Sequence, residues 1–231
     1  MDNRYIKHIN FPAIGVEGQK KLLSSSIVII GAGGLGASFA NYFVRSGVGR
    51  IKILDRDKVE LSNLQRQCIY DEADIGKPKA TCALEKLKKV NSQIKIEAEV
   101  IEFGGANAEK LIKDFDLVVD ATDNFTSRFI IDNVCSELKK PWIFTGVLGG
   151  VAQTMIINYP ATKRLSDIVP VGTNMSQIEP NVSSSVLFPA VSAIAGVASL
   201  LGIKYLTGQD YHLNTMLVFD FWNNTFKQVK F

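Results

Sequence analysis

The sequence predicts an α/β fold with a doubly wound, mostly parallel sheet. Three observations carry this prediction: short apolar runs alternate with helical patterns, a glycine cluster separates the first run from the first helix, and an aspartate ends the second run. A crossover helix returns the chain to the same end of the sheet, so strands joined in this way pair in parallel. Such alternation is typical of sheets with helices on both faces.

The expected elements follow one another along the whole chain. Apolar or alternating runs predict strands at residues 27–30, 51–54, 94–101, 117–120, 142–145, 151–157, 215–220 and 225–231. Helical spacing of apolar residues predicts helices at residues 35–45, 79–90, 126–138 and 189–206. No repeat or linker interrupts this order. We therefore expect a single domain over residues 1–231, opened by an N-terminal helical arm at residues 1–26.

One segment breaks the alternation. Residues 158–185 are polar and contain Pro160, Pro170 and Pro180. A loop of more than about 12 to 15 residues in a compact domain is usually a lid or a binding loop. We therefore expect a crossover loop here that closes over a bound substrate.

Composition limits the class of protein. The chain has 231 residues, 46% hydrophobic and 21% charged, with a formal net charge of +3. This composition excludes a disordered chain, and so mild a charge predicts no nucleic acid and no anionic membrane as partner. Cys68, Cys82 and Cys135 form no CxxC pair, so the sequence indicates neither a disulfide framework nor a zinc site. This cysteine usage is typical of a protein in a reducing compartment. No secretory signal opens the chain, so we expect a cytoplasmic enzyme.

The uncharged stretch at residues 186–203 is at the lower limit of length for crossing a bilayer. It contains Pro189, Gly196 and Gly202, and small residues among apolar ones also describe a helix buried in a core or a dimer interface. We expect the buried helix. Because the helix is apolar on more than one face, it also predicts a homodimer.

The glycine cluster carries the first functional signal. Gly31, Gly33 and Gly36 form a GxGxxG motif directly after a strand and at the opening of a helix, where backbone N–H groups hold phosphate oxygens. Asp55 ends the next strand and is placed to accept hydrogen bonds from ribose hydroxyls. Together they predict a Rossmann-like site for an adenine nucleotide.

A dinucleotide dehydrogenase would leave the following segments unexplained. The stretch 55–67 places Asn63, Arg66 and Gln67 just beyond Asp55, and the sequence GKPKA brings Lys79 to the start of a helix. DATDN at 120–124 follows a strand and presents Asp123 at the carboxyl edge of the sheet, where such folds bind ligands.

The motifs GAGGLG, SNLQRQ, GKPK and DATDNFTSR, in this order and spacing, resemble the adenylation family of ThiF, MoeB and the ubiquitin-activating E1 enzymes. The resemblance implies an adenylyltransferase that turns a carboxylate and ATP into an acyl-adenylate and pyrophosphate. It implies catalytic roles for Arg66, Lys79 and Asp123, with Asp123 holding Mg²⁺. It implies nucleotide contacts at Gly31, Gly33, Gly34, Gly36, Asp55, Asp57, Asn63, Arg66, Gln67, Lys79, Asn124 and Lys7.

Several of these residues have a structural alternative. Arg66 could pair with a surface carboxylate, Lys79 could lie on a wet helix face, and Asp123 could cap the helix at Thr126. Asp57 could equally belong to the nucleotide site or stabilise a turn. His8 and His212 lack metal-ligand spacing and are expected to be structural.

The sequence also departs from the family. Many members carry two CxxC pairs for zinc, one of them in the crossover loop, and this loop has no cysteine. Asn181 stands near the position of the cysteine that relatives use for acyl transfer, and an amide forms no thioester. Lys7, with Arg4 nearby, replaces an arginine that relatives insert into the neighbouring subunit's site.

These departures bear on the acceptor. They narrowly favour a small-molecule carboxylate, as in the zinc-free, cysteine-free methanogen enzyme of iron-guanylylpyridinol cofactor biosynthesis. The alternative is the C-terminal glycine of a ubiquitin-like sulfur-carrier protein. A non-catalytic nucleotide-binding partner subunit is a third possibility, from another class of protein.

Overall fold

The computed structural model describes residues 3–169 and 185–231. Within them a single eight-stranded sheet has the order β3-β2-β1-β4-β5-β6-β7-β8. Its strands are β1 (Ser26–Ile30), β2 (Arg50–Leu54), β3 (Lys95–Glu99), β4 (Leu117–Asp120), β5 (Trp142–Leu148), β6 (Val151–Ile157), β7 (Thr215–Asp220) and β8 (Thr225–Lys230). Strands β1 to β5 are parallel, and β6, β7 and β8 add on antiparallel. The predicted fold class is confirmed.

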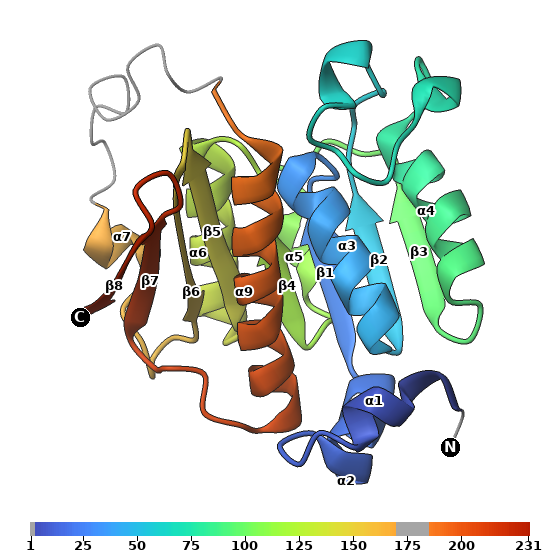
Figure 1. Ribbon diagram of the computed structural model, residues 1–231. Helices are drawn as coiled ribbons and strands as arrows, with labels where there is room; N and C mark the ends of the chain where they lie inside the picture. The colour runs from blue at the N-terminus through green and yellow to red at the C-terminus, as the bar shows by residue number, and fades with distance from the viewer. Residues whose placement is uncertain (1–2, 170–184) are drawn as a thin grey trace.

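Helices cover both faces of the sheet (Figure 1). They are α1 (Ile6–Ile9), α2 (Gly15–Ser24), α3 (Gly34–Ser46), α4 (Lys79–Val90), α5 (Ala108–Ile112), α6 (Phe125–Leu138), α7 (Leu165–Ile168) and α9 (Phe188–Thr207). Short 3-10 turns lie at η1 (Asn3–Tyr5), η2 (Leu61–Asn63) and η3 (Glu72–Asp74). Helices α3, α4 and α9 lie on one face, whereas α5 and α6 lie on the other.

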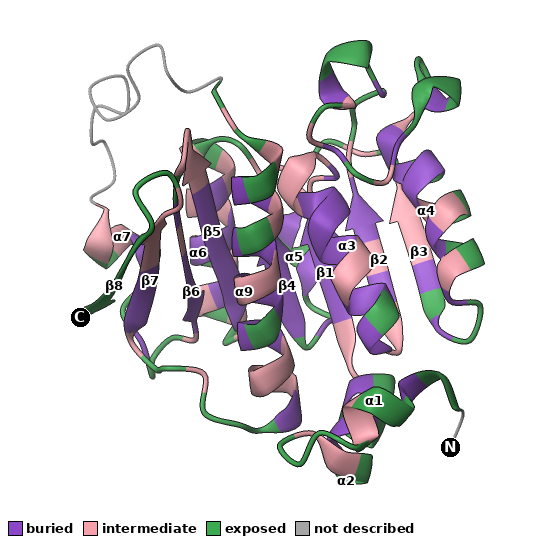
Figure 2. Cartoon of the chain, in the orientation of Figure 1, coloured by how far each residue is buried: buried purple, intermediate pink, exposed green. Residues whose placement is uncertain are grey.

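Each face of the sheet has its own apolar core, and the alternation of β1 shows why. Ile27 and Ile29 are buried with Phe39 of α3 on one face. Val28 and Ile30 are buried with Ile131, Phe144 and other residues on the second face. Because helices cover both faces of the sheet, side chains that point to either face are buried, and the central strands are apolar throughout rather than alternating. Figure 2 shows the buried strands between half-exposed helices.

The uncharged stretch forms the long helix α9. Within the described ranges it is the one helix long and apolar enough to cross a membrane, and half of its most apolar window is buried. It packs against α3, β5 and β6, with Ile194, Ala195 and Ala198 fully buried. Its outer side exposes Leu200, 60% accessible. Packing of this kind is typical of a core helix.

The N-terminal arm docks at the amino ends of the parallel strands (Figure 1). Tyr5 is buried, and Asn91 Nδ2 donates to its hydroxyl oxygen over 2.8 Å. Gln19 is also buried, and its amide donates to the carbonyl of Ser46 over 3.0 Å. These buried polar contacts join η1 and α2 to α3 and to the C-cap of α4, at the end of the sheet opposite the carboxyl ends of the parallel strands.

Several elements differ from the sequence-based expectation. The short helix α7 lies within the segment expected to be a loop, and β3 ends at Glu99 instead of residue 101. The short helix α5 was not predicted, because its five residues give too few apolar repeats, although Leu111 and Ile112 are buried. Strand β5 continues to Leu148 instead of ending at 145. Part of the predicted crossover loop, with Asn181, lies outside the described residues.

Gly49 gives a test of this packing. A Cβ built there would lie 1.8 Å from the carbonyl oxygen of Leu23, which is backbone that cannot give way locally. We expect Gly49→Ala to lower the free energy of unfolding by roughly 1–3 kcal/mol, the usual cost of overpacking. Urea denaturation measures this loss. Gly105→Ala is the control, because nothing lies within 4 Å of its built Cβ; equal stability of the two variants would contradict the packing.

Candidate active site

A cleft of about 1450 Å³ runs along the carboxyl ends of the parallel strands. Its lining comes from the turn after β1, the segments after β2 and β3, the loop after β4 and the β5–β6 hairpin. Strand order reverses between β1 and β4, and open α/β sheets bind ligands outside the carboxyl ends at that point. The volume exceeds the roughly 300–1,000 Å³ of a typical small-ligand pocket, so it can hold a nucleotide together with a second substrate.

The glycine loop lies at the centre of the cleft. Gly31 has φ of +99°, and a Cβ there would lie 2.6 Å from the carbonyl oxygen of Ala121. A Cβ at Gly36 would lie 2.0 Å from the carbonyl oxygen of Gly31. Gly33 is the N-cap of α3, and Gly34 begins that helix; both line the cleft. The N-terminus of a 13-residue helix therefore faces the position predicted for phosphate.

Asp55 is held against this loop. Its carboxylate accepts the N–H of Ala32 at 2.6 Å and the N–H of Asp57 at 2.7 Å. Tyr70, which is buried, donates its hydroxyl to the carbonyl of Ala32 at 2.9 Å, and burial raises the pKa of that phenol well above its usual range. The phenol therefore stays a neutral donor. The predicted ribose-binding carboxylate is thus fixed beside the predicted phosphate cradle.

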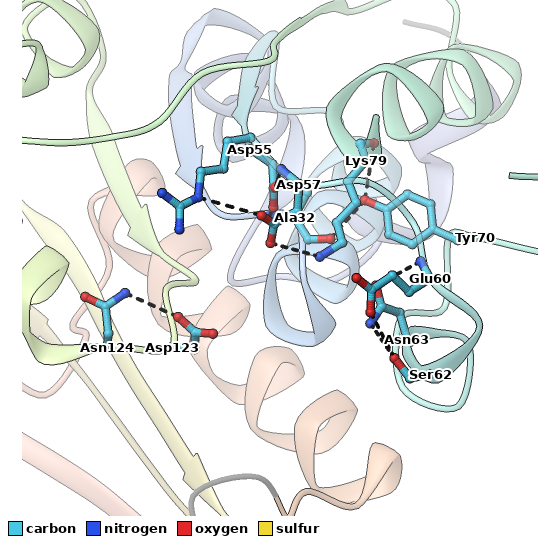
Figure 3. A network of polar contacts seen from close by, with 11 residues as sticks. Ala32, Asp55, Asp57, Glu60, Ser62, Asn63, Tyr70, Lys79, Asp123 and Asn124 are labelled. Carbon is cyan, nitrogen blue, oxygen red and sulfur yellow. Dashed lines mark hydrogen bonds and ion pairs between the residues drawn. The ribbon is translucent and has the colours of Figure 1, made fainter. Parts of the chain in front are cut away.

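Lys79 and Asp57 form an ion pair at the start of α4 (Figure 3). The Lys79 ammonium lies 3.3 Å from an Asp57 carboxylate oxygen, and the Lys79 N–H donates to the Asp57 carbonyl at 2.9 Å. Lys79 is only 7% exposed, so the alternative of a lysine on a wet helix face is wrong. Asp57 belongs to the cleft rather than only to a turn, since it meets the cation that lines it.

The segment around η2 brings three predicted residues to the same wall. Buried Asn63 accepts the Glu60 N–H at 3.2 Å and donates to Ser62 Oγ at 3.3 Å. Arg66 donates to the Ser62 carbonyl at 2.9 Å. It makes no ion pair with any described carboxylate, so the surface salt bridge considered for it is not found there. Gln67 is 3% exposed, and its side-chain oxygen has no hydrogen-bond partner among the described residues.

The loop after β4 presents Asp123 and Asn124. Asn124, not Asp123, caps α6, since its side-chain oxygen accepts the Ser127 N–H at 2.9 Å. Asp123 is exposed, and among the described residues its carboxylate accepts one hydrogen bond, from Asn124 Nδ2 at 3.2 Å. The capping alternative for Asp123 is therefore wrong. One exposed carboxylate beside a phosphate site fits Mg²⁺, which takes one or two carboxylates plus phosphate oxygens.

A buried charged pair beneath this loop was missed by sequence reasoning. Arg128 donates to Asp120 at 3.1 Å, and neither side chain is more than 8% exposed. Burial raises the pKa of Asp120, while Arg128 and the hydrogen bonds of Thr122 oppose that shift. The available signal was the arginine in TSRFII, one helical turn after the DATDN motif and inside an otherwise apolar pattern.

The cysteines do not line the cleft. Cys82 and Cys135 are buried, and burial raises the pKa of both thiols, which disfavours the nucleophilic thiolate. Cys68 is exposed, with its sulfur 3.9 Å from Ser38 Oγ. The described residues hold no cluster of three or more His, Cys, Asp and Glu side chains that could bind a metal ion.

The N-terminal residues lie away from the cleft of their own chain. Lys7 is exposed on α1, and Arg4 donates to the Val90 carbonyl at 3.0 Å. His8 contacts Gln19 at 3.1 Å, and His212 is exposed with φ of +60°. The predicted nucleotide contact of Lys7 would therefore have to be made in a neighbouring subunit.

Comparison with known proteins agrees with this geometry. The family model described as the ThiF family matches residues 5–231. The chain is 35% identical to the sulfur carrier protein ThiS adenylyltransferase of Bacillus subtilis (strain 168), with 100% of this chain and 68% of that relative covered. It is 36% identical to the adenylyltransferase and sulfurtransferase MOCS3-1 of Zea mays, with 98% of this chain covered but only 49% of that relative. The chain thus spans about half the length of the maize protein.

Solved structures support the fold. The crystal structure of Escherichia coli MccB with ATP superposes with a TM-score of 0.88 at 22% identity, over 100% of this chain and 72% of that chain. The SeMet PaaA structure superposes with a TM-score of 0.82 at 21% identity. With its glycine loop, Asp55 and Lys79 in one cleft and a family match over nearly its whole length, the chain belongs to the ThiF family.

Proposed function

We propose that this chain is an ATP-dependent adenylyltransferase that activates a carboxylate as an acyl-adenylate and releases pyrophosphate, with residues 1–231 acting as one adenylation domain. One observation carries the proposal. The helix N-terminus at Gly34, the ribose-binding position at Asp55 and the cations Arg66 and Lys79 all line one cleft that has room for a second substrate.

The reaction brings an anionic carboxylate to the α-phosphate of a polyanion. Fixed positive charge and oriented donors must therefore lie where charge accumulates. Lys79 supplies a buried ammonium, Arg66 a guanidinium and Asn63 a neutral amide on the same wall. Asp123 would hold Mg²⁺, which supplies charge neutralisation for phosphate oxygens when bound. The acceptor carboxylate is already ionised near neutral pH, so no general base is needed.

The acceptor itself is better matched by a protein tail than by a free small molecule. Aromatic side chains gather on the β7–β8 hairpin, where Phe219 and Phe226 have ring centroids 4.6 Å apart and Trp222 is 76% exposed. The hairpin adjoins the cleft, because Phe221 N–H donates to the Gly150 carbonyl next to cleft-lining Val151. Contiguous exposed apolar surface marks protein interaction sites. The B. subtilis relative, named for a sulfur carrier protein, supports the same choice.

The acceptor can be identified directly. We expect one ubiquitin-like protein of the host that ends in Gly-Gly to gain the mass of AMP when incubated with this protein, ATP and Mg²⁺. Intact-mass spectrometry of the carrier measures this. A matched carrier lacking the final glycine is the control. Pyrophosphate exchange with small carboxylates, and with none of the carriers, would reinstate the small-molecule acceptor that the sequence narrowly favours.

Lys79→Ala tests the charge-stabilising role. We expect ATP–pyrophosphate exchange to slow by roughly 10²- to 10³-fold, the usual cost of removing one preorganised donor, and Arg66→Ala to behave alike. Lys86→Ala is the matched control, since Lys86 lies on the same helix and pairs with Asp71 and Asp74 outside the cleft. An exchange rate for Lys79→Ala within twofold of wild type at saturating ATP would remove Lys79 from the mechanism.

We also propose a homodimer that covers the outer side of α9. Leu200 is exposed on α9, the longest of the described helices, with Val197 partly exposed beside it, and Leu187 at the N-cap is exposed as well. Light scattering is expected to give twice the 25.4 kDa of one chain. Leu200→Glu should shift the mass toward the monomer, whereas Leu23→Glu, an exposed leucine on α2, should not. A monomer across micromolar concentrations would contradict the proposal.

A further inference from the structure

Asp123, the carboxylate that the proposed function assigns to Mg²⁺, has few side-chain contacts that could fix its direction. Asp123 is exposed, and within the described chain its side chain accepts one bond, from the neighbouring Asn124 amide at 3.2 Å. A metal ligand needs a fixed direction, and that direction usually comes from partners behind it. The backbone of the loop must therefore set where Asp123 points.

Arg128 holds the backbone of this loop through hydrogen bonds to carbonyl groups. One terminal nitrogen of its guanidinium donates both to the carbonyl of Thr122 and to the carbonyl of Thr145, each at 3.1 Å. Thr122 immediately precedes Asp123, and Thr145 lies on the adjacent strand β5. The guanidinium thus joins the loop after β4 to the next strand of the sheet.

The arginine is itself fixed on three sides. Its Nε donates to Asp120 at 3.1 Å, and its guanidinium carbon lies 4.9 Å from the ring centroid of Phe125 and 5.4 Å from that of Phe144. Asp120 in turn accepts the N–H and the hydroxyl of Thr122, at 2.9 and 2.6 Å. Both partners of the pair thus bind Thr122, and the loop has little freedom left.

We propose that Arg128, through its buried pair with Asp120, is the positioning residue that orients Asp123 toward the metal of bound Mg²⁺–ATP. The inference rests on the proposed function, in which Asp123 is the Mg²⁺ ligand. A planar fork reaches two carbonyls and a carboxylate at once, which a lysine ammonium on a flexible stem does not reproduce. Arg128→Lys therefore keeps the positive charge opposite Asp120 and removes the hydrogen bonds to the Thr122 and Thr145 carbonyls.

The test measures ATP binding by calorimetry, once with Mg²⁺ and once with EDTA. The ratio of the two dissociation constants is the metal's contribution and requires no turnover. We expect Arg128→Lys to reduce this ratio by about tenfold, the lower range for loss of an outer-shell partner, and Asp123→Asn to reduce it at least as much. Affinity in EDTA should stay within twofold, because the glycine loop and Asp55 are untouched; a general loosening of the site would weaken both values.

Two further variants serve as controls, one for misfolding caused by an unpaired buried charge and one for a general effect of replacing a paired arginine by lysine. The double variant Asp120→Asn with Arg128→Met removes both charges together, so no unpaired carboxylate is left buried, and it should show the same reduced ratio. Arg50→Lys is the matched control. Arg50 also pairs a carboxylate through Nε, with Glu97 at 2.7 Å, and lies 4.4 Å from the Phe115 ring centroid, but at the amino end of β2.

The possible outcomes distinguish failure of the positioning role of Arg128 from failure of the proposed function. A reduced ratio in Arg128→Lys, with wild-type ratio in Arg50→Lys and thermal melting that shows folded protein, supports the positioning role. A folded Arg128→Lys variant with an unchanged ratio overturns it, as does a wild-type protein that binds ATP equally with and without Mg²⁺. Absence of ATP binding by the wild type under either condition would instead overturn the proposed function.

Discussion

The close approach of two backbone turns sets the geometry on which the whole cleft depends. The turn after β1 and the loop after β4 meet at Gly31, where any side chain would lie within 2.6 Å of the carbonyl oxygen of Ala121. These strands are neighbours in the sheet but far apart in the sequence. Glycine at this point lets α3 start beside the loop that carries Asp123. A helix N-terminus and the carboxylate proposed to hold Mg²⁺ could thus serve the same phosphate chain.

The groups that would meet the nucleotide also hold one another. Asp55 accepts the Ala32 N–H, and Tyr70 donates to the Ala32 carbonyl, so that one residue of the glycine loop is fixed from both sides. Lys79 is paired with Asp57 through side chain and backbone alike. Preorganisation of this kind lowers the cost of ordering these groups when a ligand binds. The binding groups are therefore part of the fold's own hydrogen-bonding system.

Sequence reasoning found the parts of the site that are local in the chain. The glycine motif, Asp55 and Lys79 each follow or precede a regular element whose hydrophobic pattern is strong, so their place at the carboxyl edge could be derived. The choice between Asp123 and Asn124 as helix cap could not, because both residue types cap helices and adjacent positions differ only in backbone geometry. Arg128 escaped for another reason: its partners Asp120 and Thr145 come together only when β4 pairs with β5.

The charges that line the cleft nearly cancel, which bears on the metal that the proposed function requires. The described lining includes the acidic side chains Asp55, Asp57, Glu60, Glu102 and Asp123. It includes an equal number of basic ones, Arg56, Lys58, Arg66, Lys79 and Arg128. A lining with matched charges exerts little net attraction on a polyanion, whereas attraction by a cleft requires an excess of one sign. Several of these cations are also already paired, Lys79 with Asp57 and Arg128 with Asp120. In the proposed function, a divalent cation bound with ATP would supply the missing positive charge, and the carboxylate proposed to receive it, Asp123, would need to face the phosphates. In the proposed role, the buried Arg128 beneath the loop would add to nucleotide affinity through the metal, beside the metal-independent contribution expected from the glycine loop and Asp55.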